Sequence, residues 1–236
     1  MSRPIVVITG ASSGIGAACV REFGSAGFRT IGVDIEPRSE ADEHFVVDLA
    51  TPTCGEDVMD AVGDRPVRIL VNNAAVDSDT SIMETTAEIW DRTMAINLIA
   101  PFLVSQALYP SLVAEEEASI VNMSSVHTVA TSPGAAVYAA SKGGPTLLTR
   151  AMAVEWAPAL RVNCILPGAV DTSMLLAGAG RTKQTIKEMG HRHPLGRVAN
   201  PKEIARMVRF VAVEGSFMTG SAVVVDGGVL SRLSTE

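Results

Sequence analysis

Short apolar runs alternate along the chain with longer segments in which apolar residues recur three and four positions apart. The first pattern predicts buried strands and the second predicts helices. Strands are predicted at 5–8, 29–33, 45–47, 69–71, 120–123, 162–166 and 222–225. Helices are predicted at 14–26, 55–62, 89–112, 137–156 and 201–213. Such alternation predicts an α/β fold with a doubly wound parallel sheet of about seven strands and helices on both faces.

Two places depart from this simple alternation. Only nine residues, 35–43, separate the second strand from the third. Because a parallel crossover usually needs a dozen or more residues, this connection is predicted to be a loop or a single turn. The third strand is expected beside the first. The second departure is Pro145, which cannot donate to the carbonyl of Ser141 and predicts a bend one turn after Tyr138.

Composition excludes several classes of protein. Hydrophobic residues make up 47% of the 236-residue chain. The net charge of −7 argues against a general binder of nucleic acid or anionic membranes. No run of eighteen apolar residues is present, so no membrane span is expected. Cys19, Cys54 and Cys164 are odd in number and lack a C-x-x-C spacing. This pattern predicts no disulfides and no metal site. It favours a cytoplasmic protein with reduced thiols.

The first strand ends in the glycine-rich loop Thr9-Gly10-Ala11-Ser12-Ser13-Gly14-Ile15-Gly16. Glycine lets the backbone turn sharply and approach a ligand closely. The N-terminus of the following helix offers free N–H groups to a phosphate. The order of strand, loop and helix favours dinucleotide binding; the alternative is a flexible turn rich in small residues.

Asp34 ends the second strand, eighteen residues after Gly16. An acidic residue near this distance can hydrogen-bond the ribose hydroxyl of NAD, and it repels the extra phosphate of NADP. No Arg or Lys stands in the loop or directly after Asp34, and Arg38 follows four residues later. The cofactor is therefore predicted to be NAD; the alternative is an Asp that caps a turn.

Tyr138 and Lys142 lie four residues apart in a predicted helix, and Ser125 precedes Tyr138 by thirteen residues. This spacing puts the phenol and the ammonium one turn apart on the same helix face. An ordinary tyrosine has a pKa near ~10, too high for a base at neutral pH. A nearby positive charge is expected to lower that pKa. The pair predicts proton transfer to or from an alcohol oxygen, although chance also places Tyr and Lys at this spacing.

Seven motifs follow one another in a fixed order. They are Thr9-Gly10-x-x-x-Gly14-Ile15-Gly16, Asn72-Asn73-Ala74, Asn97, Ser125, Tyr138-x-x-x-Lys142, Pro167-Gly168-x-x-x-Thr172 and Asp226-Gly227-Gly228. In this order the chain resembles the compact short-chain dehydrogenases/reductases over essentially its whole length. The resemblance implies one Rossmann-like, NAD-binding catalytic domain, 1–236. Such a domain transfers a hydride between NAD(P) and a carbonyl or alcohol, usually within a tetramer.

The resemblance also implies roles for individual residues. Tyr138 would be the catalytic acid/base, and Lys142 would lower its pKa and hold the nicotinamide ribose. Ser125 would orient the substrate oxygen, and Asn97 would help to hold a water in a relay towards Lys142. The implied cofactor contacts are Gly10, Ser12, Ser13, Gly14, Ile15, Gly16, Asp34, Ile35, Asp48, Leu49, Asn73, Ala74, Ala75, Tyr138, Lys142, Pro167, Gly168, Val170 and Thr172. Asp48 and Leu49 are expected near the adenine.

The substrate side is less well defined by the sequence. The expected substrate residues are Ser125, His127, Tyr138 and Met174. His127 resembles the His that binds a carboxylate in 3-hydroxybutyrate dehydrogenases. The Gln and Lys that accompany it there correspond here to Asp77 and Ala135, so that substrate is not carried over. A structural His beside the sheet is the alternative.

Residues 172–194 resemble the family's substrate-covering segment. Met174, Leu175 and Leu176 are expected to form an apolar wall, with Gly178 and Gly180 as flexible points. A basic cluster follows, whose simplest interpretation is a solvated helix face; attraction of an anionic substrate is the alternative. The cluster comprises Arg181, Lys183, Lys187 and Arg192.

These observations favour an NAD(H)-dependent oxidoreductase that acts on a small secondary alcohol or ketone: a polyol, sugar, cyclic alcohol or hydroxy acid. Its partners are expected to be that small molecule and copies of its own chain, as a tetramer or dimer. One alternative is a catalytically silent NAD-binding regulator or scaffold, which would not need Asn97, Ser125, Tyr138 and Lys142 together. Another is a 3-oxoacyl carrier-protein reductase, a role that usually goes with NADP.

Overall fold

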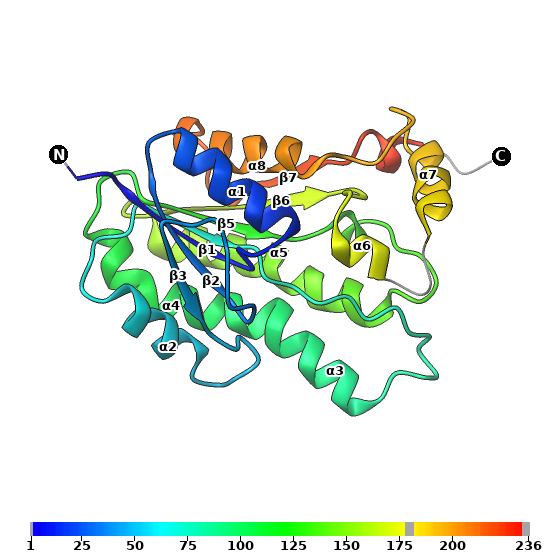
Figure 1. Cartoon of the computed structure of the whole chain (residues 1–236), viewed down its shortest axis with the longest axis horizontal. Helices are drawn as coiled ribbons and strands as arrows, with labels where there is room; N and C mark the ends of the chain where they lie inside the picture. The colour runs from blue at the N-terminus through cyan, green and yellow to red at the C-terminus, as the bar shows by residue number, and fades with distance from the viewer. Residues whose placement is uncertain (1, 178–181, 233–236) are drawn as a thin grey trace.

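A parallel sheet forms the centre of the molecule. The computed structural model describes residues 2–177 and 182–232, and within them seven strands pair in the order β3-β2-β1-β4-β5-β6-β7, all parallel (Figure 1). The strands are β1 (Ile5–Thr9), β2 (Arg29–Asp34), β3 (Glu43–Val46), β4 (Ile69–Asn72), β5 (Ser119–Met123), β6 (Arg161–Pro167) and β7 (Ala222–Val225). The predicted fold class is therefore confirmed.

Helices cover both faces of this sheet (Figure 1). The α-helices are α1 (Gly14–Ser25), α2 (Cys54–Val62), α3 (Ala87–Met94), α4 (Ala100–Val113), α5 (Ala136–Trp156), α6 (Ser173–Ala177), α7 (Lys183–Arg192) and α8 (Pro201–Arg209). Two π turns, η1 (Ala95–Ile99) and η4 (Phe210–Glu214), and two 3-10 turns, η2 (Val126–Thr128) and η5 (Val229–Ser231), complete the elements.

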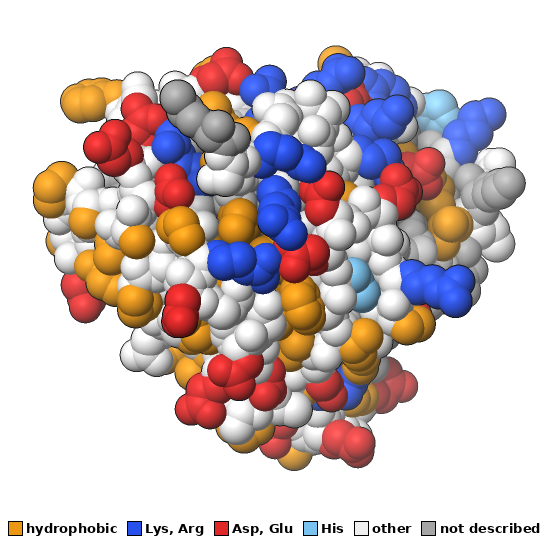
Figure 2. All heavy atoms as spheres, turned by 60° about the vertical axis from the view of Figure 1, so that its left-hand side comes forward, with side chains coloured by type: hydrophobic (Ala, Val, Ile, Leu, Met, Phe, Trp, Pro, Cys, Tyr) orange, Lys and Arg blue, Asp and Glu red, His pale blue; other side chains and the backbone are white. Residues whose placement is uncertain are grey.

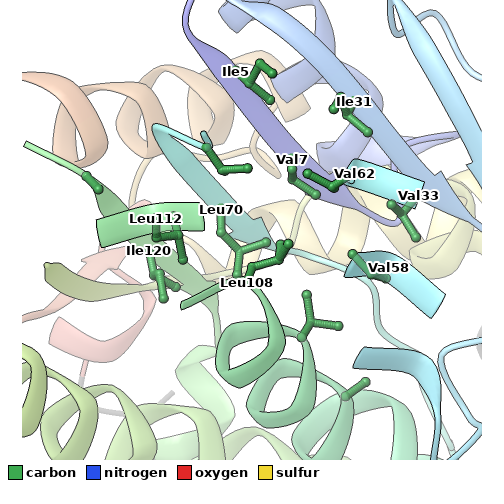
Figure 3. Close-up of a cluster of buried hydrophobic side chains, with 14 of the residues drawn as sticks. Ile5, Val7, Ile31, Val33, Val58, Val62, Leu70, Leu108, Leu112 and Ile120 are labelled. Carbon is green, nitrogen blue, oxygen red and sulfur yellow. The ribbon is translucent and has the colours of Figure 1, made fainter. Parts of the chain in front are cut away.

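Strand β1 shows how the two layers share the sheet. Successive side chains of a strand point to opposite faces. Ile5 and Val7 accordingly pack with α2, α4 and α5, whereas Val6 and Ile8 pack with α1 and α8. Figure 3 shows the core on the α2, α4 and α5 side, where Leu108 and Leu112 of α4 pack against strand residues. A strand buried on both faces explains why its sequence is continuously apolar rather than alternating.

The position of β3 corrects one expectation. β3 pairs with β2, with His44 opposite Gly32, and β1 is flanked by β2 and β4 instead. The connection 35–42 contains no helix and leads to the position next to β2, at the edge of the sheet. The prediction of a loop at this connection is confirmed, while the expected place of the third strand beside the first is wrong.

The predicted helix 89–112 is found as one 27-residue helical run, Ala87–Val113. Among the described residues it is the only helix long and apolar enough to cross a membrane, and half of its most apolar window is buried inside the protein. Its residues Val104, Leu108 and Leu112 belong to the core beneath the sheet. This degree of burial is typical of a core helix in a folded domain.

Helix α5 contains Pro145 and nevertheless runs without interruption from Ala136 to Trp156. Two hydroxyls support its carbonyls near the proline. Thr149 Oγ1 donates to the Pro145 carbonyl at 2.7 Å, and Ser124 Oγ donates to the Lys142 carbonyl at 2.9 Å. Pro145 therefore does not end the helix, and a bend at this point stays a prediction.

Charge is unevenly distributed over the surface. Figure 2 shows basic side chains gathered in the upper part of one face, on the side of the sheet that carries α1 and α8, while acidic side chains lie among them and also near the lower edge. Arg21, Arg206 and Arg209 belong to those two helices. Arg209 is paired with both Glu22 and Glu214, so part of this basic charge is neutralised locally.

Candidate active site

A cavity of about 400 Å³ opens at the carboxyl ends of the strands. The helices after β1 and β4 leave towards opposite faces of the sheet, which creates a crevice between the two strand ends. Most of the predicted site residues line this cavity: Gly10, Ser13, Gly14, Ile15, Asp34, Ile35, Asp48, Leu49, Asn73, Ala74, Ala75, Ser125, His127, Tyr138, Lys142, Pro167, Gly168, Val170, Thr172 and Met174. Ser12, Gly16 and Asn97 are not among the lining residues.

The glycine loop is packed so closely that its small residues are required. A Cβ on Gly16 would lie 1.9 Å from the Gly10 carbonyl oxygen, and one on Gly10 would lie 2.8 Å from Ala74 Cα. Gly10 also has a φ of +67°, which favours glycine. Asn73 fixes the loop from the neighbouring strand, since its Nδ2 donates to the carbonyls of Thr9 and Gly10 at 3.0 and 3.1 Å.

This loop fits a dinucleotide in two further respects. Helix α1 begins at Gly14, so its free N–H groups face the same end of the sheet as the cavity. The buried Oγ of Ser12 has no hydrogen-bond partner within the described part of the chain. A buried hydroxyl without a partner is unfavourable unless a ligand or water satisfies it. Residues of this kind suit the phosphates of a dinucleotide.

The carboxylate of Asp34 is held by two backbone N–H groups. Ser12 N–H donates to its Oδ2 at 2.9 Å, and Glu36 N–H donates to its Oδ1 at 3.1 Å. Both oxygens keep acceptor capacity, because a carboxylate can accept about four hydrogen bonds. The side chain is therefore oriented by the loops on either side of it and remains able to accept ribose hydroxyls.

Ser125, Tyr138 and Lys142 meet at another part of the cavity wall. Ser125 lies in extended backbone just after β5, where its Oγ accepts from His127 N–H at 3.2 Å. Tyr138 is in the first turn of α5, and Lys142 follows one turn later, as predicted. Lys142 is 3% exposed, its Nζ donates to the Met123 carbonyl at 2.9 Å, and it lies 5.9 Å from the centre of the Tyr138 ring.

Burial controls the protonation of this pair. It raises the pKa of Tyr138 to about 12; the negative charge of Asp77 adds to the rise, and a hydrogen bond with Ser125 opposes it. Burial also lowers the pKa of Lys142 to about 8. In the chain by itself, burial is the largest influence on the pKa of Tyr138, and the lowering of that pKa by Lys142 stays a prediction. At neutral pH Tyr138 is a neutral phenol.

Asn97 supports the site from behind. It is 1% exposed and lies in the π turn Ala95–Ile99. Its Oδ1 accepts from Val76 N–H at 2.8 Å, and its Nδ2 donates to the Val76 carbonyl and to Ser141 Oγ, both at 2.9 Å. Ser141 Oγ in turn donates to the Tyr138 carbonyl at 2.8 Å. Both amide hydrogens of Asn97 are used by the protein, and its role in a water relay stays a prediction.

His127 lies in the cavity wall, with its ring edge-on to Tyr138 at 5.7 Å between ring centres. Its Nδ1 is 3.0 Å from Thr131 Oγ1. The structure thus places His127 beside the expected acid/base. Whether it binds substrate stays a prediction.

The segment 172–194 contributes α6 and α7. Met174, Leu175 and Met189 line the cavity, while Lys187 and Arg192 are exposed on α7 and do not. The interpretation of these two charges as a solvated helix face fits this placement. Gly178, Gly180, Arg181 and the side chain of Lys183 lie outside the described residues.

Sequence reasoning missed several members of the wall. Asp79 and Arg92 line the cavity, and so does Asp77, which had been considered only as a mismatch to a carboxylate clamp. The two aspartates follow β4 at the carboxyl edge of the sheet, a position that could have marked them. His193 supports the wall: its Nδ1 donates to the Met189 carbonyl and its Nε2 accepts from Ala169 N–H. No cluster of three or more His, Cys, Asp or Glu suits a metal ion within the described residues.

Comparisons with known proteins agree with this geometry. A family model described as enoyl-(acyl carrier protein) reductase matches residues 10–230. L-xylulose reductase of Bos taurus is 37% identical over 95% of this chain and 96% of its own length. The 3-oxoacyl-[acyl-carrier-protein] reductase of Thermotoga maritima is 33% identical over 96% of this chain and 97% of its own. The aldohexose dehydrogenase structure of Thermoplasma acidophilum has a TM-score of 0.93 and 31% identity, covering 99% of this chain and 96% of that one.

The doubly wound sheet with its glycine loop defines the class of dinucleotide-binding oxidoreductases. Within this class, the chain belongs to the short-chain dehydrogenase/reductase family, whose members bind a nicotinamide cofactor.

The close packing of Gly16 generates one prediction. We expect Gly16→Ala to weaken binding of NADH and NADPH at least about tenfold, since the added methyl must displace the Gly10 carbonyl or Asn73. Gly24→Ala is the matched control, because it lies in the same helix with nothing within 4 Å of an added Cβ. Fluorescence titration measures both affinities. Equal binding by the two variants would contradict a dinucleotide role for the loop.

Burial of Lys142 generates a second prediction. Between pH 8 and the pKa of an unfolded lysine, 10.5, the unfolded chain holds a proton that the folded chain has released. Wild-type stability therefore rises with pH in this interval, by up to about 1.4 kcal/mol per pH unit. Lys142→Met removes this titration. We expect the free energy of unfolding of the variant to fall relative to wild type between pH 8 and 10, measured by urea denaturation; parallel curves would contradict it.

Proposed function

We propose that the chain is an NAD(H)-dependent oxidoreductase that interconverts a small secondary alcohol and its ketone. One observation carries the proposal: the Tyr138 phenol, hydrogen-bonded by Ser125, lines the same cavity as the glycine loop and Asp34. A proton-transfer group and a dinucleotide cradle in one cavity are the two parts that such a reaction requires. The bound nicotinamide would supply the hydride acceptor or donor.

The chain's own residues would handle the proton. Tyr138 would give its phenolic proton to the carbonyl oxygen during reduction and take the hydroxyl proton during oxidation. Ser125 would hold the same oxygen by a hydrogen bond. Lys142 would provide a positive charge near the ring when protonated, and Asn97 would fix the first turns of α5 through Ser141. Because the pKa of Tyr138 is about 12, we expect oxidation to accelerate as the pH rises above neutral.

The choice of NAD over NADP is proposed from Asp34. Its carboxylate is oriented by Ser12 and Glu36 and lines the cavity. A negative charge there accepts hydrogen bonds from ribose hydroxyls and repels a phosphate on the same ribose.

Among the substrate classes, we place polyols and sugars first. Asp77 and Asp79 line the cavity, and carboxylates are good acceptors for hydroxyl groups. The names of two similar proteins, L-xylulose reductase and aldohexose dehydrogenase, point the same way. A 3-oxoacyl carrier-protein reductase is the second candidate, favoured by the Thermotoga maritima relative. Retention of all four catalytic candidates argues against a silent scaffold.

The chain is further proposed to be cytoplasmic, since its three cysteines are free and buried, and to form a homotetramer or dimer. Two groups of exposed apolar side chains would make the contacts between copies. One lies on η1, α4 and α5 (Ile99, Phe102, Leu147, Val154), and the other near η4 and β7 (Phe210, Val213, Phe217, Val224). Exposed apolar groups of this kind are typical of protein–protein contacts.

The proposed contacts between copies predict the molecular mass of the protein in solution. Light scattering after size exclusion is expected to give two or four times the chain mass of 24.7 kDa. Val154→Glu, at a position that is 84% exposed in the single chain, is expected to reduce the mass because a buried charge at an interface is costly. A wild-type mass of one chain would contradict the proposal.

The activity itself is tested by absorbance at 340 nm. Panels of polyols, sugars, cyclic alcohols, hydroxy acids and 3-oxoacyl thioesters would be assayed with NAD(H) and NADP(H), for reduction at pH 7 and for oxidation at pH 9–10. We expect turnover with NAD(H) and a preference for a polyol or sugar. Strong preference for NADP(H) would contradict the role of Asp34.

The same assay tests Tyr138. Tyr138→Phe is expected to lower kcat by about 10²- to 10⁴-fold, the range of general acid–base catalysis, without changing the affinity for NADH. Tyr109→Phe is the control, because Tyr109 packs against Trp156 in the core. Turnover that survives in Tyr138→Phe would revive the scaffold hypothesis.

A further inference from the structure

The connection between β2 and β3, residues 35–42, carries no helix but is held by polar contacts near its start, at its middle and at its end. At its start, Glu36 N–H donates to Asp34 Oδ1 at 3.1 Å. At its end, Asp42 Oδ2 accepts from Thr30 N–H at 2.8 Å and pairs with Arg3. Such bonding is unusual for a loop whose side chains are mostly exposed, and it calls for a physical reason.

His44 makes the two hydrogen bonds that hold the middle of the connection. It lies on β3 opposite Gly32, and its ring faces back onto the connection. His44 Nε2 is 2.8 Å from the Glu36 carbonyl, and Nδ1 is 2.9 Å from Ser39 Oγ. A carbonyl only accepts, so Nε2 carries a proton and donates to Glu36, while Nδ1 shares a hydrogen bond with the Ser39 hydroxyl. One imidazole thus binds two points of the connection, three residues apart.

The clamped residues also touch the glycine loop. An added Cβ on Gly32 would lie 2.8 Å from Ser39 Oγ and 2.9 Å from the Ala11 Cβ. Ser39 and Ala11 therefore pack over the same point of β2. Ser12, the next residue after Ala11, holds the other oxygen of Asp34, so the two loops that orient this carboxylate approach the same point of β2 at Gly32.

We propose that His44 is a positioning residue for cofactor choice: by fixing Glu36 and Ser39, it holds the Asp34 carboxylate in the orientation that accepts the ribose hydroxyls of NAD. The inference rests on the proposed NAD preference. His44 does not line the cavity, so it acts through Glu36 and not on the cofactor. Arg38 lies in the same connection and is exposed. Release of the clamp would let this cation approach the position of a ribose phosphate.

Affinity for NADH and NADPH, measured by fluorescence titration without substrate, tests the proposal. We expect His44→Ala to weaken NADH binding by about two- to tenfold, the range of one hydrogen bond, and to lower the preference for NADH over NADPH. His44→Gln should keep the wild-type values, since the glutamine amide can donate to Glu36 in place of Nε2. If His44→Ala does not fold, Ser39→Ala should show a smaller change in the same direction.

Arg21→Gln is the matched control. It breaks the exposed ion pair between Arg21 and Glu40 in the same connection and should leave the preference unchanged. An unaltered preference in His44→Ala, or an equal loss in the Ala and Gln variants, would overturn the role of His44 while NAD preference stands. A wild-type protein that binds NADPH more tightly would overturn the NAD assignment and this inference with it.

Discussion

The geometry of the site depends on how α5 is fastened to β5. Asn122 of β5 donates to Thr149 of the helix at 2.9 Å, and Ser124, just after β5, donates to the Lys142 carbonyl at the same distance. Asn72 of β4 extends this bonding by donating to Asn122 at 2.8 Å. All are buried, so an unmade bond would leave a polar group without water. These buried hydrogen bonds fix the position of helix α5 along β5, and with it the position of Tyr138 relative to the end of the strand.

The same burial that positions Tyr138 and Lys142 also opposes their ionisation. A water-exposed lysine is easily charged, whereas Lys142 is 3% exposed and its pKa falls to about 8. The pKa of Tyr138 moves the other way, to about 12. Both shifts favour the neutral forms, as removal from water always does. The protein therefore holds two groups whose ionisation is less favourable than it is in water, and such perturbation is typical of sites that transfer protons.

The sequence was sufficient for features that depend on local pattern. Strands buried on both faces read as short apolar runs, and the Tyr138–Lys142 spacing placed both side chains on one helix face. Features set by distant contacts could not be read in this way. The chain order of β3 does not reveal that it lies at the sheet edge, the π turn around Asn97 has no sequence signal, and the pKa of Tyr138 follows from burial that spacing cannot report.

Strand order separates the proposed site of cofactor choice from the proposed site of proton transfer within one cavity. Asp34 ends β2, whereas Ser125 follows β5, and the order β2-β1-β4-β5 puts three strand spacings between them. At about 4.8 Å per spacing, this distance is roughly 14 Å. The carboxylate at one end is oriented by backbone N–H groups of Ser12 and Glu36, and the phenol at the other end by helix α5. Asp34 and Tyr138 share the sheet but not their supporting loops, so we expect a change in the 35–42 connection to alter the proposed cofactor preference without moving Tyr138.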